Sequence, residues 1–445
     1  MTVAASADVN LVVCGLVYTR DKENSVIEDG AVAIAGDMIV EVGSREQVLG
    51  RYPRAQAIIE EHGLIMPGLV NTHTHAAMAC FRGLADDLPL MTWLQHYIFP
   101  IEANLTAEIV YHSSLLSMAE MIKSGTTSFC DMYLFAKEVA RATSDSGMRG
   151  WLGEVLYDFD SPNYGGLESG FNYVEEMFAQ YEKHPLVTIT VDPHSVYTCS
   201  PALLQRLKEV AERRNAPYVI HLSETKDEVA GCLKLHGNTP VKHLQALGLL
   251  DEQVIAAHGV VLTEEEIELL SVCRVKVAHC PESNMKLASG VAPIPQLLAA
   301  GVTVGLGTDG CASNNDVDMF GEMDTAAKLH KVNTLDPTVM SAETTLGLAT
   351  RGGAELLGAE GEIGSIEPGK KADIIVLDLN QPHLTPMYHI PSHLVYAARG
   401  ADVIHSIING RLVMRNRRLL TIDEAAILAT MNEIGRDIRK KLGKD

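Results

Sequence analysis

Two histidines separated by one residue, His73 and His75, follow a short apolar run and could bind a metal ion. On a β-strand, residues two apart point to the same side, so both imidazoles can reach one point. Other titratable side chains lie at or near the ends of separate β-rich runs: His194, His221, His258, His279 and Asp309. Any one of these histidines could equally be a hydrogen-bonded core residue. Their repeated placement after strands favours a shared site.

A catalytic zinc ion takes about three or four nitrogen and oxygen ligands and keeps one position for water, whose pKa it lowers towards about 7. His73, His75 and His221 can supply imidazoles, and Asp309 can both bind the metal and accept a proton from the attacking water. Iron or manganese could use the same set of ligands. The residue types therefore predict a hydrolytic metal site.

Glu224 lies three residues after His221 and is a candidate general acid and base. A carboxyl group at this point can carry a proton to a ring nitrogen of a substrate. The alternative is a structural carboxylate near the positive end of a helix dipole. His258 can orient the attacking water from the other side. These two residues and Asp309 are the predicted catalytic groups.

The residues between 68 and 310 alternate between short β-rich runs and segments with helical spacing of apolar residues. The β-rich runs are 68–75, 125–133, 149–158, 187–195, 218–224, 254–262, 275–284 and 302–310. Eight βα units of this length predict a distorted (β/α)8 barrel, an α/β fold, with its active site at the C-terminal ends of the strands. We assign residues 67–367 to this barrel.

The two ends of the chain predict a second, smaller domain. Residues 1–66 and 368–445 both contain β-rich runs, joined by turn-like pairs at Gly36-Asp37 and Asn409-Gly410. We expect both ends to form one β-sandwich-like domain, with a helix at the end of the second segment. No low-complexity linker separates it from the barrel, so a close interface is expected.

The composition excludes several classes of partner. Acidic residues number 57 and basic residues 36, which gives a net charge of −21 and opposes binding to nucleic acid or an anionic membrane. The start lacks the pattern of a secretory leader, and no stretch of about 18 apolar residues follows. The 8 cysteines are scattered, as expected for thiols in a reducing compartment. We expect a cytoplasmic protein that acts on a small molecule.

The motifs of this chain resemble those of a known family over nearly the whole sequence. MPGLVNTHTH, LPLMTWLQHYIFPIE, VDPHSVYTCS, VIHLSET, AHGVVL, AHCPESN and GLGTDGCASNNDVDM are similar to motifs of the 5′-methylthioadenosine/S-adenosylhomocysteine deaminase family, in the amidohydrolase superfamily. The resemblance implies hydrolytic removal of the 6-amino group of an adenosine-type nucleoside, with release of ammonia. The chain would then be a zinc-dependent aminohydrolase.

The resemblance also implies a role for each site residue. The metal ligands would be His73, His75, His221 and Asp309, the proton shuttle Glu224, and the remaining catalytic histidine His258. Glu102 would bind the ribose hydroxyls, which suit one carboxylate as a pair of donors, and His194 would contact the substrate. Glu102 could instead be a solvated residue ahead of the helix expected from residue 106.

The expected metal count is one per subunit. Binuclear relatives usually bridge two ions with a carboxylated lysine at the end of the fourth strand, whereas the fourth run here reads VTITVDPHS and has no lysine. Zn²⁺ is expected, and Fe²⁺ or Mn²⁺ are possible alternatives. A homo-oligomer is also possible. His279 is interpreted as structure at the rim of the barrel.

The sequence also bears on which substituent the substrate carries at the ribose 5′ carbon. Some family members carry arginines near the third strand that suit the carboxylate of a homocysteine tail, but residues 150–205 contain none, and Glu154 lies in this region. We therefore expect 5′-methylthioadenosine or adenosine to be preferred over S-adenosylhomocysteine. The apolar stretch 76–105, with Leu88, Pro89, Met91, Trp93 and Phe99, could be a lid or could pack on the barrel.

Other functions remain open on the sequence. A deaminase of guanine, cytosine or a pterin, or a triazine hydrolase, would use the same metal site. A barrel that has lost catalysis and serves as a scaffold would not retain every ligand, acid and base. A phosphate-binding barrel is disfavoured because GTDGCASNN is followed by Asp316 and Asp318, which would repel phosphate.

Overall fold

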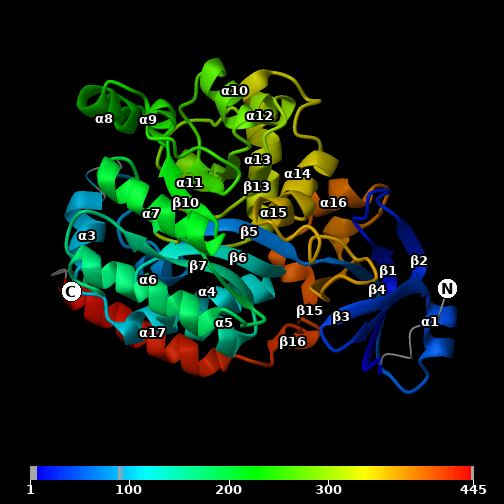
Figure 1. Ribbon diagram of the computed structural model, residues 1–445. Helices are drawn as coiled ribbons and strands as arrows, with labels where there is room; N and C mark the ends of the chain where they lie inside the picture. The colour runs from blue at the N-terminus through cyan, green and yellow to red at the C-terminus, as the bar shows by residue number, and fades with distance from the viewer. Residues whose placement is uncertain (1–7, 89–91, 93, 442–445) are drawn as a thin grey trace.

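Strands from both ends of the chain form one continuous sheet in this computed structural model, which describes residues 8–88, 92 and 94–441 (Figure 1). The strands are β1 (Leu11–Tyr18), β2 (Val26–Ala35), β3 (Met38–Ser44), β4 (Gln56–Pro67), β14 (Ile374–Asp378), β15 (Val403–Ile408), β16 (Arg411–Arg415) and β17 (Arg418–Leu419). The N-terminal and C-terminal groups join where β14 pairs antiparallel with β4. The expected sheet domain from both termini is confirmed, while its exact boundaries stay predictions.

Both turn-like pairs close hairpins in this sheet. Gly36-Asp37 joins β2 to β3, and Asn409-Gly410 joins β15 to β16. Asn409 and Gly410 have φ angles of 51° and 73°, the left-handed conformation that two-residue hairpin turns require. A β-carbon on Gly410 would lie only 1.9 Å from the carbonyl oxygen of Gly36. The two turns, far apart in sequence, therefore pack directly against each other.

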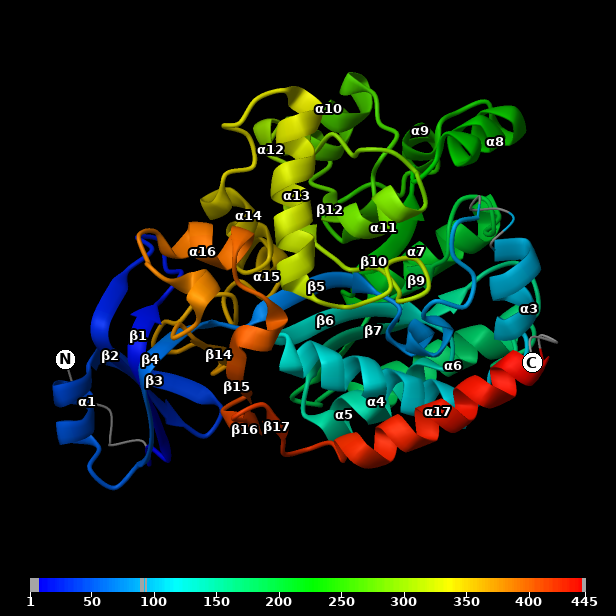
Figure 2. The same ribbon diagram turned by 180° about the vertical axis from the view of Figure 1, so that it is seen from behind.

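The middle of the chain forms a barrel of parallel strands beside this sheet (Figures 1 and 2). Its strands are β5 (Leu69–Thr74), β6 (Thr126–Tyr133), β7 (Arg149–Leu156), β8 (Val187–Ile189), β9 (Asp192–Pro193), β10 (Tyr218–Leu222), β11 (Val254–His258), β12 (Lys276–His279) and β13 (Val304–Leu306). The fourth predicted run is split into β8 and β9. Parallel bridges at Val191–Tyr218 and Thr74–Asp309 connect the two open sheets into a closed barrel.

Helices cover the outside of the barrel, which explains why every residue of β5, β6 and β7 is buried. They are α4 (Ala107–Lys123), α5 (Ala136–Ser146), α6 (Leu167–Tyr181), α7 (Pro201–Arg214), α8 (Lys226–His236), α9 (Pro240–Ala246), α10 (Glu264–Val272), α11 (Pro281–Lys286), α12 (Ile294–Ala299), α13 (Met319–Thr334), α14 (Ala342–Leu348) and α15 (Arg351–Leu356). Thr106 caps the start of α4 with its side chain, and Asn215 ends α7 in the left-handed conformation.

Three further helices belong to the terminal segments: α1 (Arg45–Arg51), α16 (Ile390–Tyr396) and α17 (Glu424–Lys441). Helix α17 leaves the sheet and runs along the barrel beside α4 (Figures 1 and 2). Lys123 of α4 forms an ion pair of 2.5 Å with Glu424, and α17 buries Ile427, Met431 and Ile438. The end of the chain thus ties the sheet domain to the barrel. Among the described helices, none is long and apolar enough to cross a membrane.

A buried ion pair joins the base of the barrel to the sheet. Arg149, the first residue of β7, donates to both carboxylate oxygens of Asp373 at 2.7 and 3.2 Å. The same guanidinium reaches the side chain of Asn409 at 3.0 Å. Burial would lower the pKa of Arg149, but the charge of Asp373 raises it above its usual value. The interface is therefore close, as expected, and contains paired charges.

Replacing Arg149 with methionine would leave the buried Asp373 carboxylate without its ionic partner. We expect Arg149→Met to lower the free energy of unfolding by about 3–5 kcal/mol, the usual cost of breaking one side of a buried pair. Thermal and denaturant midpoints of the purified protein would measure this loss. Arg436→Met, which removes a pair whose two side chains are both exposed, is the control. Equal midpoints for the two variants would contradict the prediction.

Candidate metal and substrate site

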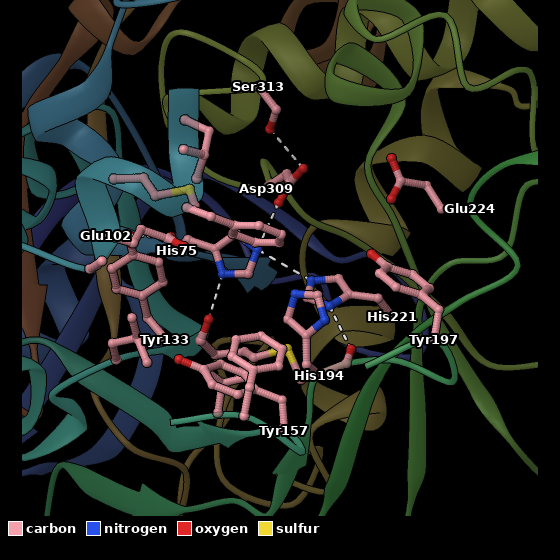
Figure 3. A pocket seen from close by; sticks show the side chains of 18 of the residues that line it. His75, Glu102, Tyr133, Tyr157, His194, Tyr197, His221, Glu224, Asp309 and Ser313 are labelled. Atoms are coloured by element: carbon pink, nitrogen blue, oxygen red, sulfur yellow. Dashed lines mark hydrogen bonds and ion pairs between the residues drawn. The ribbon is translucent and has the colours of Figure 1, made fainter. Parts of the chain in front are cut away.

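A cavity of about 310 Å³ lies at the C-terminal ends of the barrel strands (Figure 3). The predicted site residues that line it are Glu102, His75, His194, His221, Glu224, His258 and Asp309. His73 lies just beneath, with no exposed surface. His258 and Asp309 adopt left-handed φ angles of 74° and 58°. Such conformations are unfavourable for residues with a β-carbon and concentrate at functional sites.

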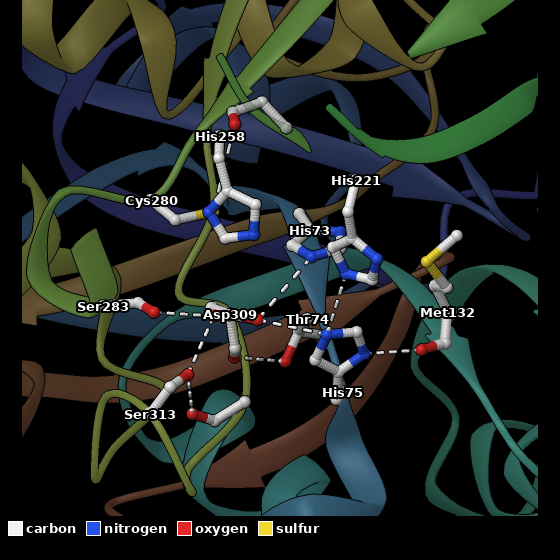
Figure 4. A network of polar contacts seen from close by, with 12 residues as sticks. His73, Thr74, His75, Met132, His221, His258, Cys280, Ser283, Asp309 and Ser313 are labelled. Carbon is white, nitrogen blue, oxygen red and sulfur yellow. Dashed lines mark hydrogen bonds and ion pairs between the residues drawn. The ribbon is translucent and has the colours of Figure 1, made fainter. Parts of the chain in front are cut away.

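The predicted metal ligands converge on one point (Figure 4). Oδ1 of Asp309 lies 3.1 Å from Nε2 of His75 and 3.6 Å from Nε2 of His73. Nε2 of His221 lies 3.3 Å from Nε2 of His75. Two atoms bound to one tetrahedral ion at about 2.0–2.1 Å are about 3.4 Å apart. The observed spacings match such an ion.

The chemistry of the donor atoms also fits a metal ion. Both ring nitrogens of His73 are buried and have no hydrogen-bond partner within the described structure. Buried polar atoms normally have partners, so an unpartnered imidazole at this point requires an explanation. Burial and neighbouring imidazoles lower the pKa values of His73 and His221 well below the usual value, which keeps them neutral. Neutral imidazole is the form that ligates a metal.

Hydrogen bonds from outside the cluster orient the ligands. Nδ1 of His221 contacts the carbonyl oxygen of His194 at 2.8 Å, and Nδ1 of His75 contacts the carbonyl oxygen of Met132. In each ring Nδ1 therefore has a carbonyl partner, and Nε2 faces the other predicted ligands. Metal-binding histidines usually have this arrangement, in which the nitrogen that does not bind the metal makes a hydrogen bond.

The carboxylate of Asp309 is held by two serines. Its Oδ2 accepts hydrogen bonds from Ser283 at 2.6 Å and Ser313 at 2.8 Å, so that Oδ1 faces the histidines (Figure 4). Burial would raise the pKa of Asp309, but its hydrogen bond with His75 and the nearby imidazoles hold it well below the usual value. The ionised form is therefore favoured at this position.

Glu224 and His258 form the predicted acid–base pair beside this cluster. Nε2 of His258 lies 3.9 Å from Oε2 of Glu224. Oε1 of Glu224 accepts a hydrogen bond from Ser289 at 3.1 Å, and Nδ1 of His258 contacts Oδ1 of Asn284 at 3.0 Å. Glu224 precedes Thr225, the residue that caps α8. The side chain of Glu224 lines the cavity, and its place directly before the helix cap also keeps it next to the positive end of α8.

Glu102 lies across the cavity from Glu224, and His194 lies beside His221 (Figure 3). Glu102 is the last residue of the short helix α3 (Phe99–Glu102), and its Oε1 accepts a hydrogen bond from the hydroxyl of Tyr133 at 2.7 Å. Burial raises the pKa of Glu102, although the Tyr133 hydroxyl opposes this shift. Nδ1 of His194 is within 2.9 Å of the Thr198 hydroxyl. Glu102 is thus held in the site rather than solvated.

The walls of the cavity are aromatic and its charges are negative. The rings of Tyr157 and Phe159 stack with centroids 3.9 Å apart, and Phe159 is 48% exposed at the mouth. The lining carboxylates are Glu102, Asp160, Glu224 and Asp309, and none of the described lining residues is lysine or arginine. Glu154 lies outside the lining, where burial raises its pKa to about 7. The described lining therefore offers no lysine or arginine to a substrate carboxylate.

The stretch 76–105 is only partly described. Leu88 and Phe99 pack against the core, and Phe99 also lines the cavity. The stretch includes two short irregular helices, η1 (Ala76–Phe81) and η2 (Leu94–Ile98). Pro89, Met91 and Trp93 lie outside the described residues. Whether the stretch moves as a lid stays a prediction.

Sequence reasoning missed the residues that hold the acid–base groups. Ser283, Asn284 and Ser289 follow the seventh strand, and Ser313 follows Asp309 by four residues. The signal was the polar motif HCPESN at a strand end, which we interpreted only as rim structure. His279, in the same motif, does have a structural contact: its Nε2 lies 3.0 Å from Nε2 of the buried His330.

Comparison with known proteins identifies relatives of this chain. The model of the amidohydrolase family matches residues 64–413, and a model of an imidazolonepropionase-like composite domain of bacteria matches residues 30–55. The 5-methylthioadenosine/S-adenosylhomocysteine deaminase of Syntrophobacter fumaroxidans is 53% identical, over 96% of this chain and 98% of its own length. The corresponding protein 1 of Syntrophus aciditrophicus is 50% identical, over 97% and 98%.

Solved structures show the same fold. An adenosine deaminase from Xanthomonas campestris with bound zinc superimposes with a TM-score of 0.95 at 39% identity, covering 97% of this chain and 99% of that chain. An atrazine chlorohydrolase from Arthrobacter aurescens complexed with zinc has a TM-score of 0.88 at 23% identity, over 96% and 100%, and shares the fold. The chain belongs to the amidohydrolase family and, within it, to the 5-methylthioadenosine/S-adenosylhomocysteine deaminases, which confirms the resemblance found in its motifs.

Proposed function

We propose that this protein is a zinc-dependent aminohydrolase that converts the 6-amino group of an adenosine-type nucleoside to the inosine analogue and releases ammonia. The single observation that carries the proposal is the meeting of three kinds of group in one cavity. These are a His3Asp cluster with metal spacing, the Glu224–His258 pair, and Glu102 on the opposite wall. The names of the relatives and the zinc in a structural neighbour support it.

His73, His75, His221 and Asp309 would hold one ion per subunit. The unpartnered nitrogens of His73 and the spacing of the ligand atoms support this assignment. Zinc suits a site of imidazoles and one carboxylate, although iron or manganese could use the same donors. When bound, the ion lowers the pKa of water and so supplies the hydrolytic nucleophile at neutral pH.

The side chains of the chain supply the proton transfers. We assign Oδ1 of Asp309 to accept the proton of the attacking water, and His258 to orient that water. We assign Glu224 to protonate N1 of the adenine ring as C6 is attacked. The resulting tetrahedral carbon carries a hydroxyl and the amino group. Its hydroxyl proton passes to Glu224 or Asp309, and one of these two carboxyls gives a proton to the amino group. The C6–N bond then breaks, ammonia leaves and the C6 carbonyl forms. The buried Glu224 carboxyl, 3.9 Å from His258, supports this shuttle role.

Glu102 would bind the two ribose hydroxyls, and His194 would contact the substrate between the metal and the mouth of the cavity. The Tyr133 hydroxyl donates to one oxygen of Glu102, and among the described residues no hydrogen bond occupies the other oxygen, which would accept from the ribose. The ring of His194 lies between those of His221 and Tyr157, with centroid distances of 5.0 and 6.4 Å, which supports this placement.

Location, partners and assembly form a separate part of the proposal. We place the enzyme in the cytoplasm, because its cysteines are all free and a reducing compartment keeps them so. The partner is a small nucleoside and not a nucleic acid, since the net charge of −21 opposes binding to phosphate backbones. A homo-oligomer remains a proposal that light scattering would test.

A spectrophotometric screen of nucleosides and bases, with metal analysis of the same preparation, tests the activity. The panel is adenosine, 5′-methylthioadenosine, S-adenosylhomocysteine, guanine and cytosine. We expect 5′-methylthioadenosine and adenosine to exceed S-adenosylhomocysteine in kcat/KM by about tenfold, or about 1.4 kcal/mol. The reason is that the cavity presents Asp160 and no described cation to the amino-acid tail. Equal or higher kcat/KM for S-adenosylhomocysteine would rule out this preference.

Replacing Glu224 by glutamine removes the proton shuttle but keeps the shape of the side chain. We expect Glu224→Gln to retain its metal and to lose about 10²–10⁴-fold in kcat, the usual contribution of a general acid and base. Steady-state assays and metal analysis would measure both quantities. The matched control is Asp227→Asn, an exposed carboxylate in the same loop and helix start. Activity near that of the wild type in Glu224→Gln would refute the assigned role.

Replacing Glu102 by glutamine separates nucleosides from free bases. Loss of a charge-assisted contact to the ribose should lower kcat/KM for adenosine by about 10–100-fold. Free adenine lacks the ribose and should be affected far less. Parallel assays of both compounds measure the ratio, with the exposed Glu108→Gln as control. A similar loss for both compounds would remove Glu102 from ribose recognition.

A further inference from the structure

The segment that follows β12, residues 281–289, reaches each of the acid–base groups of the site. Ser283 donates to Oδ2 of Asp309 at 2.6 Å, and Asn284 contacts Nδ1 of His258 at 3.0 Å. Ser289, at the end of the segment, contacts Glu224, the proposed proton shuttle. One short piece of chain therefore touches three groups that come from three other strands.

The third contact is the hydrogen bond from the Ser289 hydroxyl to Oε1 of Glu224, at 3.1 Å. Glu224 is 8% exposed, so water can replace this donor only poorly. Among the described residues, no other hydrogen bond to the Glu224 carboxylate is found. Its second oxygen, Oε2, faces His258 at 3.9 Å. Ser289 therefore fixes one oxygen and leaves the other for a proton transfer.

The end of α11 sets the position of Ser289. The backbone N–H of Ser289 donates to the carbonyl oxygen of Asn284, five residues earlier, at 2.9 Å. This hydrogen bond is typical of helices that end with one residue in the left-handed conformation. Ala288 supplies the left-handed residue with a φ of 54°. Glycine usually occupies this position, because a β-carbon makes the conformation unfavourable. Ala288 therefore has a backbone conformation that is unfavourable for its residue type, and its side chain is exposed.

After this turn the segment passes close to the ends of neighbouring strands. A β-carbon on Gly290, whose φ is 133°, would lie 2.9 Å from Cγ1 of Val260. The backbone N–H groups of Val260 and Val261 both donate to the carbonyl oxygen of Ser223, at 3.0 and 2.8 Å. Ser223 immediately precedes Glu224. The loop after β11 therefore bonds to the loop after β10, and the loop after β12 lies beside both. Ser289, in the loop after β12, makes the hydrogen bond to Glu224 in the loop after β10.

We propose that Ser289 is a positioning residue for the proton shuttle, acting through Glu224 and not on the substrate itself. The inference rests on the function proposed above. With Oε1 anchored, the carboxyl group has few side-chain conformations, so less conformational freedom is lost when it meets the ring nitrogen. Ser289 does not line the cavity among its described residues, which agrees with an indirect role.

The first test is the kinetics of Ser289→Ala and Ser289→Thr on the metal-loaded enzyme with 5′-methylthioadenosine. We expect Ser289→Ala to lower kcat about tenfold, as loss of a hydrogen bond to a charged group does, with KM and metal content within about twofold. Ser289→Thr keeps the hydroxyl and should recover most of kcat. The control is Ser271→Ala, a half-buried serine that donates to the Ala300 carbonyl far from the cavity.

A double-mutant cycle separates positioning from general stability. In the Glu224→Gln background, Ser289→Ala should have little further effect on the residual kcat, because its target no longer transfers protons. An equal loss in both backgrounds, or an unchanged kcat in Ser289→Ala alone, would overturn the proposal. If the wild type deaminates no nucleoside in the panel, the proposed function itself has failed. If the wild type is active and Ser289→Ala is unaffected, only this inference has failed.

Discussion

The desolvated nitrogen and oxygen atoms that meet at the C-terminal end of the barrel are the constraint on which the rest of the site depends. His73 has no exposed surface, and neither ring nitrogen has a partner among the described residues. Unpaired polar atoms are costly in such a place, and a divalent cation bound by Nε2 and three other ligands would remove that cost for this nitrogen. The hydrogen bonds on Asp309 and His221 then follow as the means of aiming each donor atom inward.

Residues of the site come both from strands and from the loops that follow them. His73 and His221 lie within strands β5 and β10, where neighbouring strands fix the backbone on both sides. Glu102, Glu224 and Ser289 lie in the segments after strands, where the chain can vary without disturbing the barrel. The barrel strands therefore hold two of the four proposed metal ligands directly, while the other two, His75 and Asp309, follow β5 and β13. The acid–base groups need additional contacts between loops, and the segment after β12 provides them.

The cavity is negatively charged both near the predicted metal ligands and near its mouth. Close to the ligands, ionised Asp309 favours a cation, and its low pKa keeps that charge at neutral pH. Farther out, stacked Tyr157 and Phe159 offer apolar faces while Asp160 adds a negative charge at the mouth. The whole chain is acidic, with a net charge of −21. A neutral nucleoside meets less electrostatic opposition along this path than a nucleoside whose tail carries a carboxylate.

The sequence by itself determined the barrel, the terminal sheet and the list of metal and catalytic candidates. These follow from local rules: alternation along strands, helical spacing, and polar residues such as His73 and His75 at a strand end. Only the tertiary structure decided that α17 docks on α4, that Tyr133 holds Glu102, and that Ser289 reaches Glu224. Such contacts join residues far apart in the chain through loops whose conformations, like the left-handed Ala288, leave no periodic signal in the sequence.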